Sequence, residues 1–338
     1  MKLTSLAPIL ILSLLLASCT ATTALPTSTA HPTELPPRSG TIRFSQAGMA
    51  SIRDVPSLMA YDALREMGYT VEVVPFAKTS LMPAALEKGD VDFTDANASL
   101  IWAAAARGAD VRTVAAKHSN TFVFVTSADI KDCRQLDARP VAFATRQSVG
   151  YLMFERYVAT HCPGATPELV LIAESSNRVA GMMAGEFSGV YLELQDWLAL
   201  QETLGDRNHV LIDFAAEFPD VLVILLSTRR EWAARNPQIV HDYLRELLIA
   251  QRKILADRQV LVEGIIHYLE MSPDDAAGLA DAYLAVNMWD ANGTLTVERV
   301  ERTLSWLGEA GLLTGQLAPA DVADLSYLNA VLDELGRQ

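Results

Sequence analysis

Hydrophobic residues recur with two different periods in the central part of the chain. Residues 41–44 alternate between polar and apolar side chains, which is typical of a strand with one buried face. The stretch 55–67 instead places Leu58 and Tyr61 on one face of a helix, and Gly68 is a typical helix end. The pattern predicts a strand followed by a helix at the start of the folded region.

The alternation of strand and helix continues to about residue 226. We expect further strands at 69–75, 91–94, within 111–126, and at 140–144, 168–172, 190–192, 210–212 and 221–226. We expect helices between them at 80–88, 100–106, 148–160 and 178–184. This order predicts an α/β protein with a mostly parallel, doubly wound sheet. From residue 231 onward the pattern is helical, with expected helices at 237–256, 260–269, 273–284, 297–310 and 326–335.

The first residues have a different pattern. Lys2 precedes an apolar run over 6–16, and the small residues Ala17 and Ser18 follow it. This layout is typical of a secretory signal, and the run is shorter than the roughly 20 apolar residues of a membrane span. The next residue, Cys19, makes the site resemble a bacterial lipobox, in which the cysteine is lipidated. The alternative is an ordinary signal peptide with an incidental cysteine nearby.

We therefore expect a lipoprotein signal peptide at 1–18 and a lipidated, palmitate-bearing Cys19. Residues 19–40 are dominated by Thr, Ser, Ala and Pro without apolar periodicity, which predicts a semi-extended tether. The folded body is then extracytoplasmic and anchored to the cell membrane by its lipid.

Length and charge narrow the function classes. With 338 residues, two domains are expected, and the formal net charge of −14 argues against a nucleic-acid partner. The sequence has no G-x-S-x-G, H-E-x-x-H or P-loop motif, and its six histidines are scattered. We expect no metal site, no cofactor and no catalytic residue.

Cys133 and Cys162 remain as a pair once Cys19 is assigned to lipid. In an oxidising compartment they form either a disulfide or two buried thiols, and spacing alone leaves both open.

Three short motifs, in this order, resemble one family. Residues 85–93 (ALEKGDVDF) and 178–186 (RVAGMMAGE) resemble its helix–Gly–strand steps, and 324–336 resembles its last helix. The family is that of ABC-transporter substrate-binding proteins, within the nitrate/sulfonate/taurine group and the group that binds the pyrimidine precursor of thiamine.

This resemblance implies the type II periplasmic-binding-protein fold, with two α/β lobes joined by crossing strands near 121–126 and 221–227. The lobes would comprise 41–126 with 222–338, and 127–221. A hinge would close them over a ligand. The implied partners are a small solute, a permease and its ATPase, and the protein itself would be a monomer.

Ligands of open α/β sheets lie beyond the carboxyl ends of the strands. Polar residues at these places give the ligand-binding candidates Gln46, Thr79, Ser80, Asn97, Trp102, His118, Gln147, Ser148, Ser176 and Glu193.

Each candidate also has a structural interpretation. The hydroxyl residues and Asn97 are typical helix caps. Trp102 is equally typical of a core, and His118 of a surface loop. A carboxylate such as Glu193, at the end of an apolar strand, pairs either with a neighbouring arginine or with a cationic ligand.

The charges near these positions are mixed. Lys78, Lys117 and Arg146 would suit an anion such as a sulfonate, whereas Glu174, Glu193 and Asp196 would suit a cation. The expected function is capture of a small organic solute for an ABC importer, either sulfonate- or taurine-like or a pyrimidine or amine compound, without enzymatic activity. The alternatives are a ligand-sensing lipoprotein that signals to a membrane receptor, and an enzyme like the thiamine-pyrimidine synthase.

Overall fold

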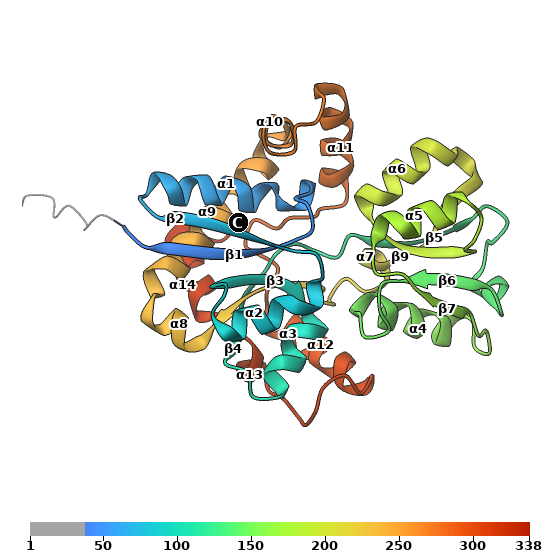
Figure 1. Ribbon diagram of the computed structural model, residues 1–338, viewed down its shortest axis with the longest axis horizontal. Coiled ribbons are helices and arrows are strands. Elements are labelled where there is room, and N and C mark those ends of the chain that lie inside the picture. The colour runs from blue at the N-terminus through green and yellow to red at the C-terminus, as the bar shows by residue number, and fades with distance from the viewer. Residues whose placement is uncertain (1–37) are drawn as a thin grey trace, which may run out of the picture. The chain divides into compact units, whose positions relative to one another are not determined.

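Two five-stranded sheets organise residues 38–338, the part of the chain that the computed structural model describes (Figure 1). The expected signal peptide, Cys19 and most of the expected tether lie outside these residues. Arg38 already belongs to the folded body, because its Nε donates to Asp242 Oδ2 over 2.5 Å. Among residues 38–338, no helix has both the length and the apolar character needed to cross a membrane.

The first sheet has the order β2-β1-β3-β10-β4. Its strands are β1 (Thr41–Ala47), β2 (Thr70–Phe76), β3 (Phe93–Asn97), β4 (Val111–Ala116) and β10 (Ile224–Arg229). The second sheet has the order β7-β6-β8-β5-β9. Its strands are β5 (Phe122–Ser127), β6 (Pro140–Phe143), β7 (Glu168–Leu171), β8 (Gly189–Glu193) and β9 (Asn208–Asp213). We call the parts of the chain around them the first and second lobes.

Each sheet contains one strand that runs against its neighbours. β10 pairs antiparallel with β3 and β4, and β5 pairs antiparallel with β8 and β9. The sheets are therefore mixed, where the alternation of strands and helices predicts mostly parallel pairing. The reason is topological: β5 and β10 enter their sheets from the other lobe, after the chain has crossed over.

The two segments that connect the lobes lie slightly earlier in the chain than the predicted crossing strands. The chain leaves the first sheet after β4 and joins the second sheet at β5, so residues 122–126 are hydrogen-bonded to the second sheet and not to the first. It returns between α7 (Phe214–Glu217) and β10.

Helices cover the sheets in both lobes. Beside the first sheet and its return segment lie α1 (Val55–Glu66), α2 (Met82–Lys88), α3 (Ala98–Ala106), α8 (Arg230–Arg235), α9 (Pro237–Ala256), α12 (Val297–Glu309), α13 (Pro319–Val322) and α14 (Ser326–Leu335). With the second sheet go α4 (Val149–His161), α5 (Ser175–Met183) and α6 (Leu194–Leu204). The pair α10 (Arg258–Leu269) and α11 (Pro273–Ala285) extends from the end of α9 (Figure 1). Single 3₁₀ turns are η1 (Ile52–Asp54), η2 (Thr79–Leu81), η3 (Cys133–Leu136) and η4 (Gly205–Arg207).

Aromatic side chains form the centre of each lobe. Phe44 on β1 packs against Tyr61 of α1 and Tyr243 of α9, with ring centroids 4.3 and 4.6 Å apart. In the second lobe, the ring centroids of Phe124 and of Phe154 on α4 are 4.6 Å apart. These rings attach the covering helices to their sheets and so fix the loops at the strand ends.

A disulfide joins Cys133 and Cys162, whose Cα atoms are 5.9 Å apart. It connects η3 to the end of α4 within the second lobe. This is the pair that the sequence leaves open between a bridge and two thiols.

Candidate functional site

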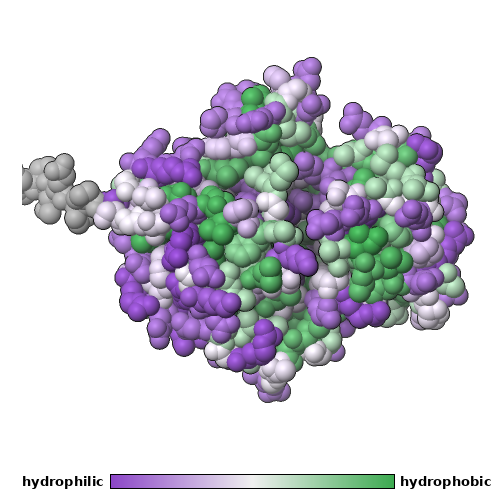
Figure 2. All heavy atoms as spheres, in the orientation of Figure 1, coloured by the Kyte–Doolittle hydropathy of each residue, from purple (hydrophilic) through white to green (hydrophobic). Residues whose placement is uncertain are grey.

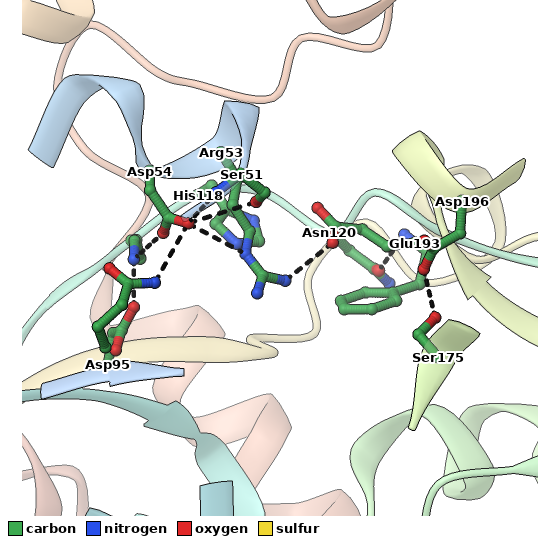
Figure 3. A network of polar contacts seen from close by, with 12 residues as sticks. Ser51, Arg53, Asp54, Asp95, His118, Asn120, Ser175, Glu193 and Asp196 are labelled. Carbon is green, nitrogen blue, oxygen red and sulfur yellow. Dashed lines mark hydrogen bonds and ion pairs between the residues drawn. The ribbon is translucent and has the colours of Figure 1, made fainter. Parts of the chain in front are cut away.

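Charged side chains gather where the carboxyl ends of strands from both lobes face each other (Figure 3). The first lobe supplies Arg53 and Asp54 from η1 and Asp95 from β3, and the second supplies Glu193 from the end of β8. Lys117 follows β4, at the start of the crossing segment. Figure 2 shows a recess with hydrophilic residues in the middle of one face of the molecule.

Lys117 lies between two carboxylates in the first lobe. Its side chain is 6 % exposed, and its Nζ donates to Asp54 Oδ1 over 2.5 Å and to Asp95. Burial lowers the pKa of Lys117, but the two carboxylates outweigh this and raise the pKa well above its ordinary value. Burial would raise the pKa of Asp54, but Lys117 and Arg53 bring it far below the usual range. The pair is therefore ionised.

Asp95 is in a different electrostatic position. Burial and the charge of Asp54 raise its pKa, although Lys117 acts in the opposite direction. Of the two carboxyl groups beside Lys117, Asp95 is consequently less readily ionised than Asp54.

An ion pair connects the two lobes. Nη1 of Arg53 donates to Glu193 Oε2 over 3.0 Å, and Arg53 Nε lies 4.0 Å from Asp54 Oδ2. Burial raises the pKa of Glu193 against the effect of Arg53, and the charge of Asp196 adds to the increase. Of the two partners that the sequence leaves open for Glu193, an arginine or a cationic ligand, the structure shows the arginine.

His118 follows Lys117 and is 3 % exposed. Its Nδ1 lies 2.7 Å from the carbonyl oxygen of Ser119, which can only accept, so Nδ1 carries the proton. Burial and the charge of Arg53 lower the pKa of His118 to about 3. The ring is therefore neutral at physiological pH, with Nε2 as a free acceptor that has no hydrogen-bond partner among the described residues.

The second lobe adds a hydroxyl and a carboxylate. The Ser175 hydroxyl at the start of α5 donates to Asp196 on α6. Tyr283 of α11 is fully buried, and burial together with the charge of Glu193 raises its pKa well above the ordinary value. Its hydroxyl has no hydrogen-bond partner among the described residues.

The structure brings three of the ten predicted ligand residues together here. Gln46 is buried and its Nε2 donates to Asp54 Oδ2 over 3.4 Å. His118 and Glu193 lie around Arg53, as described.

The other candidates have separate roles or positions. Asn97 and Ser148 cap α3 and α4, since they accept from the backbone N–H of Ser99 and Tyr151. The structure corrects the prediction that Trp102 binds ligand. This residue is fully buried in the core, and its indole N–H donates to Thr113 Oγ1 over 3.0 Å.

Four candidates are exposed in the described structure: Thr79, Ser80, Gln147 and Ser176. Thr79 and Ser80 lie in η2, and Gln147 accepts from Thr145 Oγ1 over 2.5 Å. The hydroxyl in contact with the acidic residue is that of Ser175, one position before the predicted Ser176.

Sequence reasoning missed Arg53, Asp54 and Tyr283 as site residues. A signal for the first two is present. Ser51 and Asp54 form a capping box, in which Ser51 N donates to Asp54 Oδ2 over 2.8 Å, and this pattern marks a helix start after β1. Tyr283 had no such signal, because it reaches the site from α11, far along the chain.

The chain resembles known proteins at two levels. A family model described as NMT1/THI5 like matches residues 64–259, more than half of the chain. None of the curated protein sequences compared with the chain matches it.

Solved structures match nearly the whole described body. The ligand-binding component of an ABC-type import system from Staphylococcus aureus has a TM-score of 0.72 at 17 % identity, covering 86 % of this chain and 99 % of that one. The periplasmic aliphatic sulphonate binding protein SsuA from Escherichia coli gives 0.67 at 14 %, with coverage of 84 % and 92 %. The periplasmic nitrate-binding protein NrtA from Synechocystis PCC 6803 gives 0.71 at 11 %, with coverage of 88 % and 89 %. These likenesses establish the two-lobed fold of periplasmic binding proteins and confirm the predicted fold class.

Proposed function

The chain belongs to the NMT1/THI5-like family, and from this membership we propose that it is an extracytoplasmic solute-binding protein of an ABC importer. Its ligand is a small organic solute, held between the lobes and enclosed when they close. The names of the structural neighbours, which describe ABC import, sulphonate binding and nitrate binding, support this role.

The observation that carries the proposal is the polar cluster between the lobes. Arg53 and Glu193 come from opposite lobes and bond across 3.0 Å. A solute that binds beside this pair would contact both lobes at once, and its binding energy would favour the closed arrangement. Transport then needs the permease and ATPase as partners.

We also propose a binding rather than a catalytic role. The buried charges of the cluster are engaged with one another, Lys117 with Asp54 and Arg53 with Glu193. Such pairs orient side chains for recognition. These ion pairs and the lack of G-x-S-x-G, H-E-x-x-H and P-loop motifs in the sequence support this proposal.

The anchor is a proposal from the sequence alone. Lipidation of Cys19 would keep the receptor beside its permease. Metabolic labelling with radioactive palmitate should label the wild-type chain and not a Cys19→Ala variant. Equal labelling of both would remove the anchor from the proposal.

Thermal-shift screening of the full chain tests the central claim. A panel of sulfonates, nitrate, amines and pyrimidines should contain at least one compound that raises the melting temperature. A ligand present at about 100 times its dissociation constant stabilises the folded state by about 2.7 kcal/mol. Small-angle X-ray scattering with that compound should show a smaller radius of gyration. If no small solute of the panel changes either quantity, the proposal is wrong.

A further inference from the structure

Three buried acceptor atoms of the site have no hydrogen-bond partner among residues 38–338. They are Asp95 Oδ1, Glu193 Oε1 and His118 Nε2. Each comes from a different segment: β3, the end of β8 and the crossing segment. A buried acceptor without a donor is unfavourable, so three in one site indicate that a donor belongs there.

His118 is the observation that is independent of the acidic residues. It is only 3 % exposed, and its ring lies beside Arg53 and Asp54 (Figure 3). Its Nδ1 proton is used by the Ser119 carbonyl, so Nε2 can only accept. A neutral imidazole held in this tautomer recognises an N–H or O–H group and repels an oxygen of an anion.

The two cations of the cluster already have carboxylate partners. Lys117 donates to both Asp54 and Asp95, and Arg53 donates to Glu193. The amide of Gln46 donates to Asp54. Of the buried atoms of the site that lack a partner among residues 38–338, three can therefore only accept, and the fourth, the hydroxyl of Tyr283, can both donate and accept.

The charges point the same way. The cluster holds four acidic side chains and two cations. The acidic side chains are Asp54, Asp95, Glu193 and Asp196, and the cations are Arg53 and Lys117. Burial raises the pKa values of Asp95 and Glu193 although Lys117 and Arg53 act in the opposite direction, so a further positive charge beside these two carboxyl groups would be favourable.

We propose that the solute is an organic nitrogen cation, a protonated amine or amidinium, whose N–H groups donate to Asp95, Glu193 and His118. The proposal rests on the solute-binding function above and specifies its ligand class. It separates this chain from neighbours that are named for sulphonate or nitrate.

Calorimetric titration of the full chain with charge-matched probes tests the proposal. Butylamine and butyramidine serve as cations, and butanesulfonate and nitrate serve as anions, all at neutral pH. At least one of the cations should bind at least tenfold more tightly than butanesulfonate. Glu193→Gln should weaken cation binding at least tenfold.

Glu202→Gln is the matched control, because Glu202 is an exposed carboxylate of the same lobe, near the end of α6. It should leave cation binding unchanged. Asp95→Asn is the second site variant, used if Glu193→Gln is not folded by circular dichroism, and the same tenfold loss is expected for it.

The results distinguish the two proposals. Binding of butanesulfonate or nitrate without the cations would overturn the ligand class and leave the solute-binding function standing. Cation binding that is insensitive to both site variants would overturn the assignment of these carboxylates. If the charged probes and the wider panel of solutes all fail to bind, the solute-binding function fails as well.

Discussion

Lys117 balances two buried carboxylates, so its charge matters more for stability than that of a surface lysine. Lys117→Met would leave Asp54 and Asp95 close together without their shared cation. Removal of one partner from a buried ion pair typically costs about 3–5 kcal/mol. We expect a loss of this size in the free energy of unfolding by urea.

Lys78→Met is the control for this prediction, since Lys78 is exposed on the same lobe. It should change the free energy by less than about 0.5 kcal/mol. Equal effects of the two substitutions would contradict the central role of Lys117.

His118 makes stability depend on pH in a defined direction. Its pKa is about 3 in the folded chain, against about 6.5 in an unfolded one, so the unfolded state takes up the proton first. Stability contributed by the neutral ring is present above pH 6.5 and is lost as the pH falls toward 3. Between pH 7 and pH 5 the linkage relation gives a loss of about 2 kcal/mol.

The measurement is urea unfolding of the wild type and His118→Gln at both pH values. The groups facing His118 are Arg53, Lys117 and Asp54, and they stay charged over this range. The variant should lose about 2 kcal/mol less than the wild type. A parallel loss in both proteins would mean that another group causes it.

At this scale the sequence predicted where site residues lie better than what they touch. Gln46 and Glu193 lie at the carboxyl ends of strands and His118 follows one closely, and the rule for strand ends located them. Glu193 and Arg53 are 140 residues apart, so no local pattern reveals their pairing. The predicted Ser176 is one residue away from Ser175, which makes the contact. This offset depends on the residue at which α5 begins, and helix ends are the least predictable feature of a helix.

At the scale of elements, α4 packs on the second sheet through a position that tolerates no side chain. A Cβ at Gly150 would lie 2.3 Å from the ring of Tyr191 on β8. Gly150→Ala should therefore destabilise the protein by about 1–3 kcal/mol, which is typical of overpacking. Differential scanning calorimetry would measure this as a lower melting temperature.

Gly278→Ala is the matched helix substitution. Gly278 lies in α11, and a Cβ there meets nothing within 4 Å. Because alanine is the better helix former, this change should stabilise the protein by up to about 1 kcal/mol. Destabilisation by both changes would refute the packing argument at Gly150.

The disulfide stabilises the connection between η3 and α4. Its cysteines are 29 residues apart, and in the chain-entropy model a loop of this length contributes about 3–4 kcal/mol. Reduction, or a Cys133→Ser/Cys162→Ser double variant, should lower the free energy of unfolding by this amount. An unchanged urea midpoint in the reduced protein would contradict the prediction.

Most elements could be predicted from periodicity and from glycines at helix ends, and their order carried the fold class. The direction of β5 and β10 could not be predicted. Strand direction in a mixed sheet depends on where the chain re-enters after crossing, and residues within the strand carry no signal for that.

At the scale of the whole molecule, the Arg53–Glu193 pair favours contact between the lobes. Arg53→Met would leave Glu193 without its cation in a largely buried place. We expect the unliganded variant to be more open, with a larger radius of gyration by small-angle X-ray scattering than the wild type.

Arg156→Met offers an exposed counterpart. Arg156 of α4 bonds to Glu309 of α12 over 2.8 Å, and both side chains are about half exposed. Exposed ion pairs contribute about 0–1 kcal/mol, so this variant should scatter like the wild type. An unchanged radius in Arg53→Met as well would show that the ion pair does not hold the lobes together.

The insertion of β10 between β3 and β4 has a consequence for synthesis. All strands of the second sheet lie within residues 122–213, so this sheet can form as soon as that stretch has emerged. The first sheet begins earlier in the chain, yet it lacks a central strand until residues 224–229 arrive. While the chain emerges from its N-terminus, the edges of β3 and β4 that will pair with β10 therefore stay unpaired, although the second sheet is already complete. In this interval the nascent chain most needs a chaperone.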